Sequence, residues 1–210
     1  MMKKSGIQFV VVLTTLLLGV SAWGQAAKEF SAIIVQNTDG KIVRQKLFSG
    51  QGKIRIEPES ATPDAAILIL DFSRGASYVL MPYQKKYVEV NAGESSAPSK
   101  MRFLNVTDPL HPCDALPQPG QAKLACKEVG QTAVDGRPAI QWVAKLPDGK
   151  NGYVWIDAKF GFPIKLEAPG NTVLIEVIRE GAQDSILFEI PAGYTRLQLS
   201  SMEGSNKQSD

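Results

Sequence analysis

Residues 66–72 read AILILDF, a run that is apolar on both faces of the strand it predicts. Side chains alternate between the two faces of an extended chain, so Ile67 and Ile69 lie on one side. Leu68 and Leu70 then lie on the other side. A strand with two apolar faces needs cover on both, which is typical of a sheet that curls over itself or packs against a second layer.

A second run, TVLIEVI at 172–178, has the same two-faced character. Regular alternation groups its apolar side chains as Val173, Ile175 and Val177 against Leu174 and Ile178. An apolar ligand on one face of these two strands would contact side chains from both runs. The candidate lining residues are Ile67, Leu68, Ile69, Leu70, Leu174 and Ile178.

Most other segments predict half-buried strands joined by tight turns. The runs KIRIEPE at 53–59 and PIKLEAP at 163–169 alternate apolar and charged residues. Asp-Gly pairs at 39–40 and 135–136 tolerate the positive φ angles of hairpin turns. Helical candidates are few, with residues 98–106 the main one. The sequence therefore predicts a mainly β fold: an antiparallel meander curled into a half-open barrel, with one or a few short covering helices.

The beginning of the chain has the order of a secretory signal peptide: a basic start, an uncharged apolar run and small residues before a cleavage site. A membrane-anchoring helix is the alternative interpretation. We expect a signal peptide at 1–24, a single β domain at 25–199 and a disordered tail at 200–210. The mature protein, without a transmembrane segment, is expected in the periplasm, with secretion as the alternative.

The net charge argues against polyanionic partners. The formal charge is +2, and Lys3 and Lys4 leave with the signal peptide, so the mature chain carries about 2 − 2 = 0. A near-neutral protein with scattered charges lacks the basic surface that nucleic acids and anionic membranes require. We therefore expect no nucleic-acid partner.

Residues 111–126, HPCDALPQPGQAKLAC, contain both cysteines and the one histidine of the chain. In an exported protein two cysteines predict a disulfide, here Cys113–Cys126. A structural zinc ion needs four ligands, and His111 with the two cysteines supplies three. Metal binding and thiol chemistry at this loop remain alternatives. We interpret the stretch as a structural clamp, without metal or cofactor.

Catalytic motifs are absent from the sequence: it contains no G-x-S-x-G, H-E-x-x-H, P-loop or G-x-G-x-x-G pattern. The acidic residues are spread singly, as expected of polar positions on alternating strands. We assign no catalytic residue and expect that the protein is not an enzyme. A hydrolase built from converging carboxylates is the alternative.

Three segments resemble exported bacterial proteins of the lipoprotein-carrier (LolA-like) superfamily, and more closely its uncharacterised relatives than the carrier itself. They are EFSAIIVQNTDGKIVRQKLFSGQGKIRIE, DFSRGASYVLMPYQKKYVEV and GYVWIDAKFGFPIKLEAPGNTVLIEVI, the last followed by LFEIPAGYTRL. The resemblance implies a half-open antiparallel barrel with a few helices as a lid. Its apolar concave side would take acyl chains or serve as a protein-binding surface. The clamped loop is not a feature of the carrier.

We therefore expect a non-enzymatic exported protein that holds an apolar ligand, a lipid or the acyl chain of a lipoprotein, on the concave face of the sheet. The alternative is a protein-interaction or envelope-sensing module that docks a partner with the same sheet. A cavity lined by aliphatic side chains favours the first function, and a flat exposed apolar patch favours the second.

Overall fold

The computed structural model describes residues 29–60, 62–91, 112–116 and 124–198. Three predictions fall outside these ranges: the signal peptide at 1–24, the tail at 200–210 and the helix at 98–106. His111 also lies outside them.

The described chain forms one twelve-stranded sheet with the strand order β12-β6-β5-β4-β3-β2-β1-β11-β10-β9-β8-β7. The strands of the first half are β1 (Phe30–Thr38), β2 (Lys41–Gly50), β3 (Lys53–Pro58), β4 (Ile67–Asp71), β5 (Ala76–Met81) and β6 (Lys86–Asn91). Those of the second half are β7 (Cys126–Val134), β8 (Arg137–Lys145), β9 (Asn151–Asp157), β10 (Pro163–Ala168), β11 (Asn171–Glu180) and β12 (Thr195–Leu197). Short 3-10 turns are η1 (Pro82–Gln84), η3 (Pro112–Ala115) and η4 (Ser185–Phe188).

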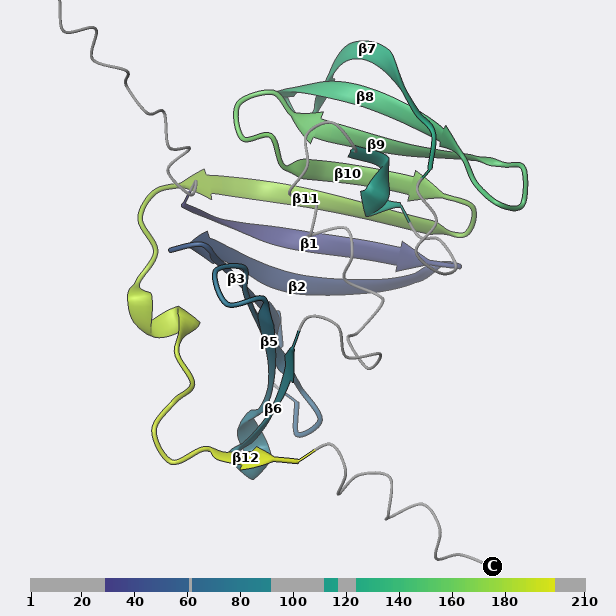
Figure 1. Cartoon of the computed structure of the whole chain (residues 1–210). Helices are drawn as coiled ribbons and strands as arrows, with labels where there is room; N and C mark the ends of the chain where they lie inside the picture. Colours follow the sequence, from purple (N-terminus) through teal and green to yellow (C-terminus); the bar gives the residue numbers. More distant parts are fainter. Residues whose placement is uncertain (1–28, 61, 92–111, 117–123, 199–210) are drawn as a thin grey trace, which may run out of the picture.

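The sheet curls but does not close. Strands β7 to β11 lie above β1 and β2, while β3 to β6 and β12 turn away below them (Figure 1). The edge strands β7 and β12 stand at opposite ends of the strand order, so the predicted half-open, mainly antiparallel barrel is confirmed. Strand β12 runs parallel to β6, which the sequence pattern did not predict. Among the described residues the covering elements are 3-10 turns and not α-helices.

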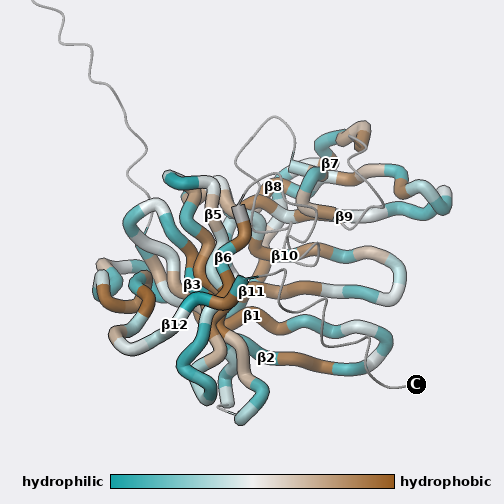
Figure 2. Tube along the Cα trace, turned by 60° about the horizontal axis from the view of Figure 1, so that its bottom comes forward, coloured by the Kyte–Doolittle hydropathy of each residue, from teal (hydrophilic) through white to brown (hydrophobic). Residues whose placement is uncertain are grey.

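Asp-Gly hairpins order the meander as predicted. Asp39 and Gly40 have φ angles of 49° and 86°, and Asp135 and Gly136 have 49° and 75°. Positive φ at both central residues is the property of turns whose twist matches that of the flanking strands. In Figure 2 the hydrophilic stretches mark such turns, and the hydrophobic stretches lie within the strands.

The inner face of the sheet is the side on which the two halves of the curl share one core. One row of paired residues crosses six neighbouring strands and comprises Val88, Val79, Leu68, Ile56, Leu47 and Ala32. A second row comprises Val90, Ser77, Leu70, Ile54, Ser49 and Phe30. Neither row contains a charged side chain. The core continues over the other half of the sheet through Val154, Leu166 and Val173.

A bulge in β11 changes which side chains face inward. Between the pairs Ile33–Glu176 and Ser31–Arg179 one residue of β1 faces two of β11, so the alternation shifts by one position. Val177 adopts φ of 54° and is 48% exposed, whereas Ile178 packs against the core. The prediction that Val177 lies on the same face as Val173 and Ile175 is therefore wrong, because the alternation changes after Glu176.

We expect Val177→Asn to stabilise the protein. The left-handed region is unfavourable for a β-branched residue by about 1–2 kcal/mol, and asparagine tolerates it better. Half of the valine surface is already exposed, so little apolar burial is lost. Urea unfolding should show a gain of about 0.5–1 kcal/mol. Val129→Asn is the matched control, because Val129 is 56% exposed in β7 without a positive φ, and it should show no gain.

Candidate functional site

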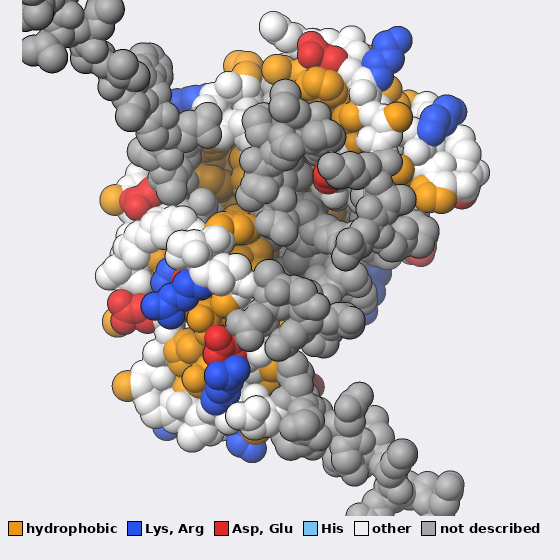
Figure 3. Space-filling view, in the orientation of Figure 1, with side chains coloured by type: hydrophobic (Ala, Val, Ile, Leu, Met, Phe, Trp, Pro, Cys, Tyr) orange, Lys and Arg blue, Asp and Glu red, His pale blue; other side chains and the backbone are white. Residues whose placement is uncertain are grey.

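The candidate lining residues divide between the two faces of the sheet. Leu68 and Leu70 lie in the two inner rows, and the bulge in β11 turns Ile178 to the same inner side. Leu68 is 5% exposed, whereas Leu70 and its neighbour Val79 are only partly buried. In the space-filling view, hydrophobic side chains gather between the charged ones on the side of the molecule shown (Figure 3).

The other three candidates lie on the outer face. Ile67 pairs with Leu80, and Ile69 pairs with Arg55 and Tyr78. Ile69 is 1% exposed, so this face is covered as completely as the inner one at β4. Leu174 pairs with Val35 and Lys165 on the same outer side of the sheet. The six predicted residues therefore do not form one surface.

Cover for the outer face comes from residues 181–198, which we call the C-terminal strap. It leaves the end of β11, forms η4 and continues to β12 (Figure 1). Phe188 of η4 is 3% exposed and lies over Gly50, where a Cβ atom would approach the phenyl ring to 3.1 Å. The Arg55 guanidinium donates a hydrogen bond to the Leu187 carbonyl (2.9 Å). The sequence did not predict this strap. Its one local mark is Asp184, whose side chain accepts a hydrogen bond from the Ile186 amide at the start of η4.

At the opposite end the inner face is covered by η3 and Leu116. Cys113 of η3 and Cys126 of β7 form the predicted disulfide, with Cα atoms 5.7 Å apart. η3 packs against β8, β9 and β10, and its residue Cys113 is fully buried. Next to it Leu116 fills the space above Gly152, where a Cβ atom would lie 2.9 Å from the leucine Cδ1. Because Gly152 has no side chain, Leu116 can pack directly against the backbone of β9.

Replacing both cysteines by serine should lower the free energy of unfolding by about 2–4 kcal/mol, because the cross-link restricts the unfolded chain. Equilibrium urea unfolding measures this loss. As a control, thiol titration of the unfolded, unreduced wild-type protein should find no free sulfhydryl. Two titratable thiols in protein from an oxidising compartment would contradict the clamp.

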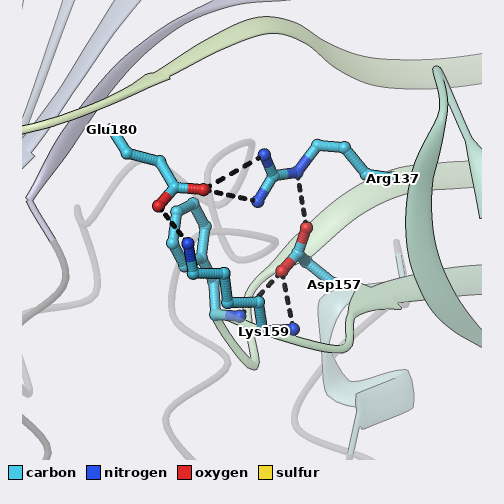
Figure 4. Close-up of polar contacts among 5 residues, drawn as sticks. Arg137, Asp157, Lys159 and Glu180 are labelled. Atoms are coloured by element: carbon cyan, nitrogen blue, oxygen red, sulfur yellow. Dashed lines mark hydrogen bonds and ion pairs between the residues drawn. The ribbon is translucent and has the colours of Figure 1, made fainter.

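A cluster of charged side chains around the buried Asp157 joins β8, the β9–β10 turn and the end of β11. The Arg137 guanidinium donates to Asp157 (2.6 Å) and contacts Glu180 (3.4 Å), and the Lys159 ammonium pairs with Glu180 (Figure 4). Arg137 also lies 4.7 Å above the ring of Phe160. The amides of Lys159 and Phe160 donate to Asp157 Oδ1, at 2.9 and 2.7 Å. The cluster fixes the β9–β10 turn against β8 and β11.

The arrangement of these charges favours a structural role. Two basic and two acidic groups neutralise one another, and Asp157 is 1% exposed with three donors around it. The hydrogen bond from Lys159, aided by Arg137, lowers the pKa of Glu180. A carboxylate with a lowered pKa is a poor general base near neutral pH. The hydrogen bond to Asp157 in turn raises the pKa of Arg137.

Asp71 ends β4 in a similar environment. Its side chain is 2% exposed, and its Oδ1 accepts from the Ser73 hydroxyl (2.6 Å) and from the Ser73 and Arg74 amides (3.1 Å each). Lys53 Nζ lies 3.5 Å from Oδ2. Burial alone would raise the pKa of Asp71, but the donors from Ser73 and Arg74 and the charge of Lys53 outweigh it. The pKa of Asp71 is therefore lower than its ordinary value of 3.8.

We expect Asp71→Asn to reduce the free energy of unfolding at pH 7 by roughly 1–2 kcal/mol, since the charge-assisted bonds are lost. A lowered folded-state pKa means that the wild-type carboxylate stabilises above the ordinary pKa and loses this effect as the pH falls through the folded value. The difference between variant and wild type should therefore shrink below pH 4. Urea unfolding at pH 7 and pH 3 measures it, and an unchanged difference would contradict the assignment.

Among the described residues no three His, Cys, Asp or Glu side chains come together in a way that could hold a metal ion. No helix in the same part of the chain has the length and apolar character needed to cross a membrane.

The chain shares its fold with several solved structures. An uncharacterized conserved protein from Thermus thermophilus aligns at 7% identity and a TM-score of 0.52, over 81% of this chain and 90% of that one. MucB aligns at 14% identity and a TM-score of 0.51, over 79% of this chain. The matched part spans 58% of the length of MucB. Another match is the LolA superfamily protein NE2245 from Nitrosomonas europaea, at 8% identity, 80% and 91% coverage and a TM-score of 0.33.

The described chain forms the half-open sheet that the resemblance implies, and it shares this fold with the Thermus thermophilus protein and with MucB. No family model matches the sequence, and no curated protein matches it. The likeness therefore concerns the architecture, and the function has to be argued from the site.

Proposed function

We propose that the protein is an exported, non-enzymatic binding protein that holds an apolar ligand on the inner face of its sheet. The supporting observation is the pair of uncharged rows through Leu68 and Leu70, which cross six neighbouring strands. Aliphatic side chains without charged partners suit the acyl chain of a lipid or lipoprotein. Each buried methylene contributes about 0.8 kcal/mol, so a long chain binds without charged contacts.

We infer the position of the ligand from the inner-face side chains that are only partly buried. Leu70 and Val79 are partly buried, although Ile54 and Leu68, next to them in the inner rows, belong to the core. At the other end of the face, η3 and Leu116 already occupy the surface of β8 to β10. The ligand therefore belongs over β4 and β5, next to Leu70, rather than over the clamp.

Export is part of the same proposal. Residues 1–24 would act as the signal peptide, 25–199 as the binding domain and 200–210 as a solvated tail. The destination would be the periplasm, or the medium in the case of secretion. A disulfide between Cys113 and Cys126 suits such an oxidising compartment.

A docking module for a protein partner is the second candidate function. The observation that favours it is the fold shared with MucB, which in Pseudomonas aeruginosa forms a complex with MucA. The same architecture thus serves a protein–protein complex in another protein. In this function the sheet would bind a polypeptide of the cell envelope and not a lipid.

The test compares two asparagine variants of neighbouring positions in β4. Leu70→Asn changes the inner face and Ile67→Asn the outer face, and both side chains are partly buried. The delipidated protein is titrated with a fluorescent fatty acid, and the probe is competed with a phospholipid and an acylated peptide. We expect Leu70→Asn to weaken binding by about tenfold or more, from the lost apolar contact, and Ile67→Asn by less than about twofold.

Ionic strength separates this mode of binding from an electrostatic one. Affinity should be nearly the same in low and high salt, because no charged side chain lies in the two inner rows. Circular dichroism confirms that both variants are folded. Failure of every apolar probe to bind the folded wild-type protein would overturn the acyl-binding proposal in favour of the docking module.

A further inference from the structure

The two edges of the sheet are protected in different ways. Strand β7 carries the exposed charges Lys127 and Glu128 and a register shift between Glu128 and Gly130. Charges and bulges are devices that prevent an edge strand from pairing with another chain. Strand β6 at the other end has a regular register with β5 and carries the buried Val88 and Val90. Its edge depends on β12 for protection.

In the part of the chain that the structure describes, β12 pairs with half of that edge. Thr195, Arg196 and Leu197 pair in parallel with Lys86, Tyr87 and Val88, the first half of β6. The Thr195 amide donates to the Lys85 carbonyl (3.0 Å), and Arg196 Nη1 lies 3.0 Å from Glu89 Oε2. Thr195 and Arg196 are exposed and Leu197 is half-buried. The pairing buries little apolar surface and is correspondingly weak.

The rest of the strap is held independently of β12. Phe188 is buried against Gly50, and Arg55 binds the Leu187 carbonyl. Residues 189–194 separate this anchor from β12. Release of three residues at the end of the strap therefore leaves the contacts of Phe188 and Leu187 with β2 and β3 in place. In the space-filling view, hydrophobic side chains gather where β6 and β12 lie in Figure 1 (Figure 3).

We propose that the edge of β6 is a strand-accepting site for an extended peptide segment of a protein partner, and that β12 is an exchangeable cover of this site. A six-residue partner strand could pair with the whole of β6, from Lys86 to Asn91, where β12 pairs with three residues. Main-chain hydrogen bonds then give affinity and alternate side chains give specificity. The site is the edge of the sheet, and it does not depend on binding of an acyl chain.

The side chains of β6 define the partner sequence. Val88 and Val90 lie on the inner side and favour aliphatic residues opposite them, as Leu197 is opposite Val88. Glu89 favours a basic residue opposite Tyr87, the place that Arg196 takes, and Lys86 favours an acidic one. A parallel partner strand therefore reads acidic, basic, aliphatic, any residue, aliphatic.

The experiment uses the full chain and a fluorescein-labelled peptide of residues 191–198, PAGYTRLQ, which contains β12. Arg196→Glu places two like charges together at Glu89 and so releases β12 without truncation. We expect this variant to bind the peptide about tenfold or more tightly than the wild type, because the internal competitor is removed. Fluorescence anisotropy measures the affinity, and Leu197→Asn provides a second released variant.

A charge exchange tests the register. Glu89→Lys in the released variant should abolish binding of the arginine peptide and restore binding of a peptide with glutamate at that place. Lys127→Glu at the other edge is the control and should change nothing. Equal peptide affinity of wild type and both released variants would overturn the proposal, as would indifference to Glu89→Lys. Dimerisation of the released variants in size-exclusion chromatography would instead assign the edge to a second copy of this chain.

Discussion

At β4 the sheet buries both of its faces, and the remaining architecture has to supply that cover. Leu68 on the inner side and Ile69 on the outer side are 5% and 1% exposed. The inner side is covered because the sheet curls over its own core, and the clamp of η3 adds to it. On the outer side the C-terminal strap covers the neighbouring strands β2 and β3 through Phe188 and the Arg55–Leu187 hydrogen bond. The need to bury apolar side chains on both faces thus favours both the curl of the sheet and the position of the strap.

The turn between β4 and β5 and the turn between β9 and β10 are built in the same way. Asp71 and Asp157 are the buried charged residues of the described chain, and each ends a strand. Each accepts hydrogen bonds from the amides two and three positions further on, and each pairs with a basic side chain of a neighbouring strand. A glycine with positive φ follows four positions after each aspartate, at Gly75 and Gly161. The common pattern D-x-x-x-G is a signal that the sequence analysis did not use.

The sequence predicted local structure well because its signals are local. Asp-Gly pairs, alternating strands and two cysteines close together in the sequence each depend on a few neighbouring residues. The bulge at Val177 was missed because valine carries no sign of a left-handed conformation; the pairing with β1 imposes it. The strap was missed because its contacts with Gly50 and Arg55 depend on residues far away in the sequence. The candidate lining was divided between two faces for the same reason: alternation groups side chains but does not say which group faces inward.

Strand β12 also affects the order in which the fold can be completed. Thr195 pairs with Lys86, a separation of 195 − 86 = 109 residues, and β11 and η4 have to be placed before the strand can reach its partner. Contacts of this range form late because the intervening loop has to be closed first. During synthesis, which begins at the amino terminus, β6 is therefore present long before β12 is available to cover its edge. During that interval nascent chains at high concentration would pair through this edge, and a chaperone that binds extended β-strands would shorten the delay.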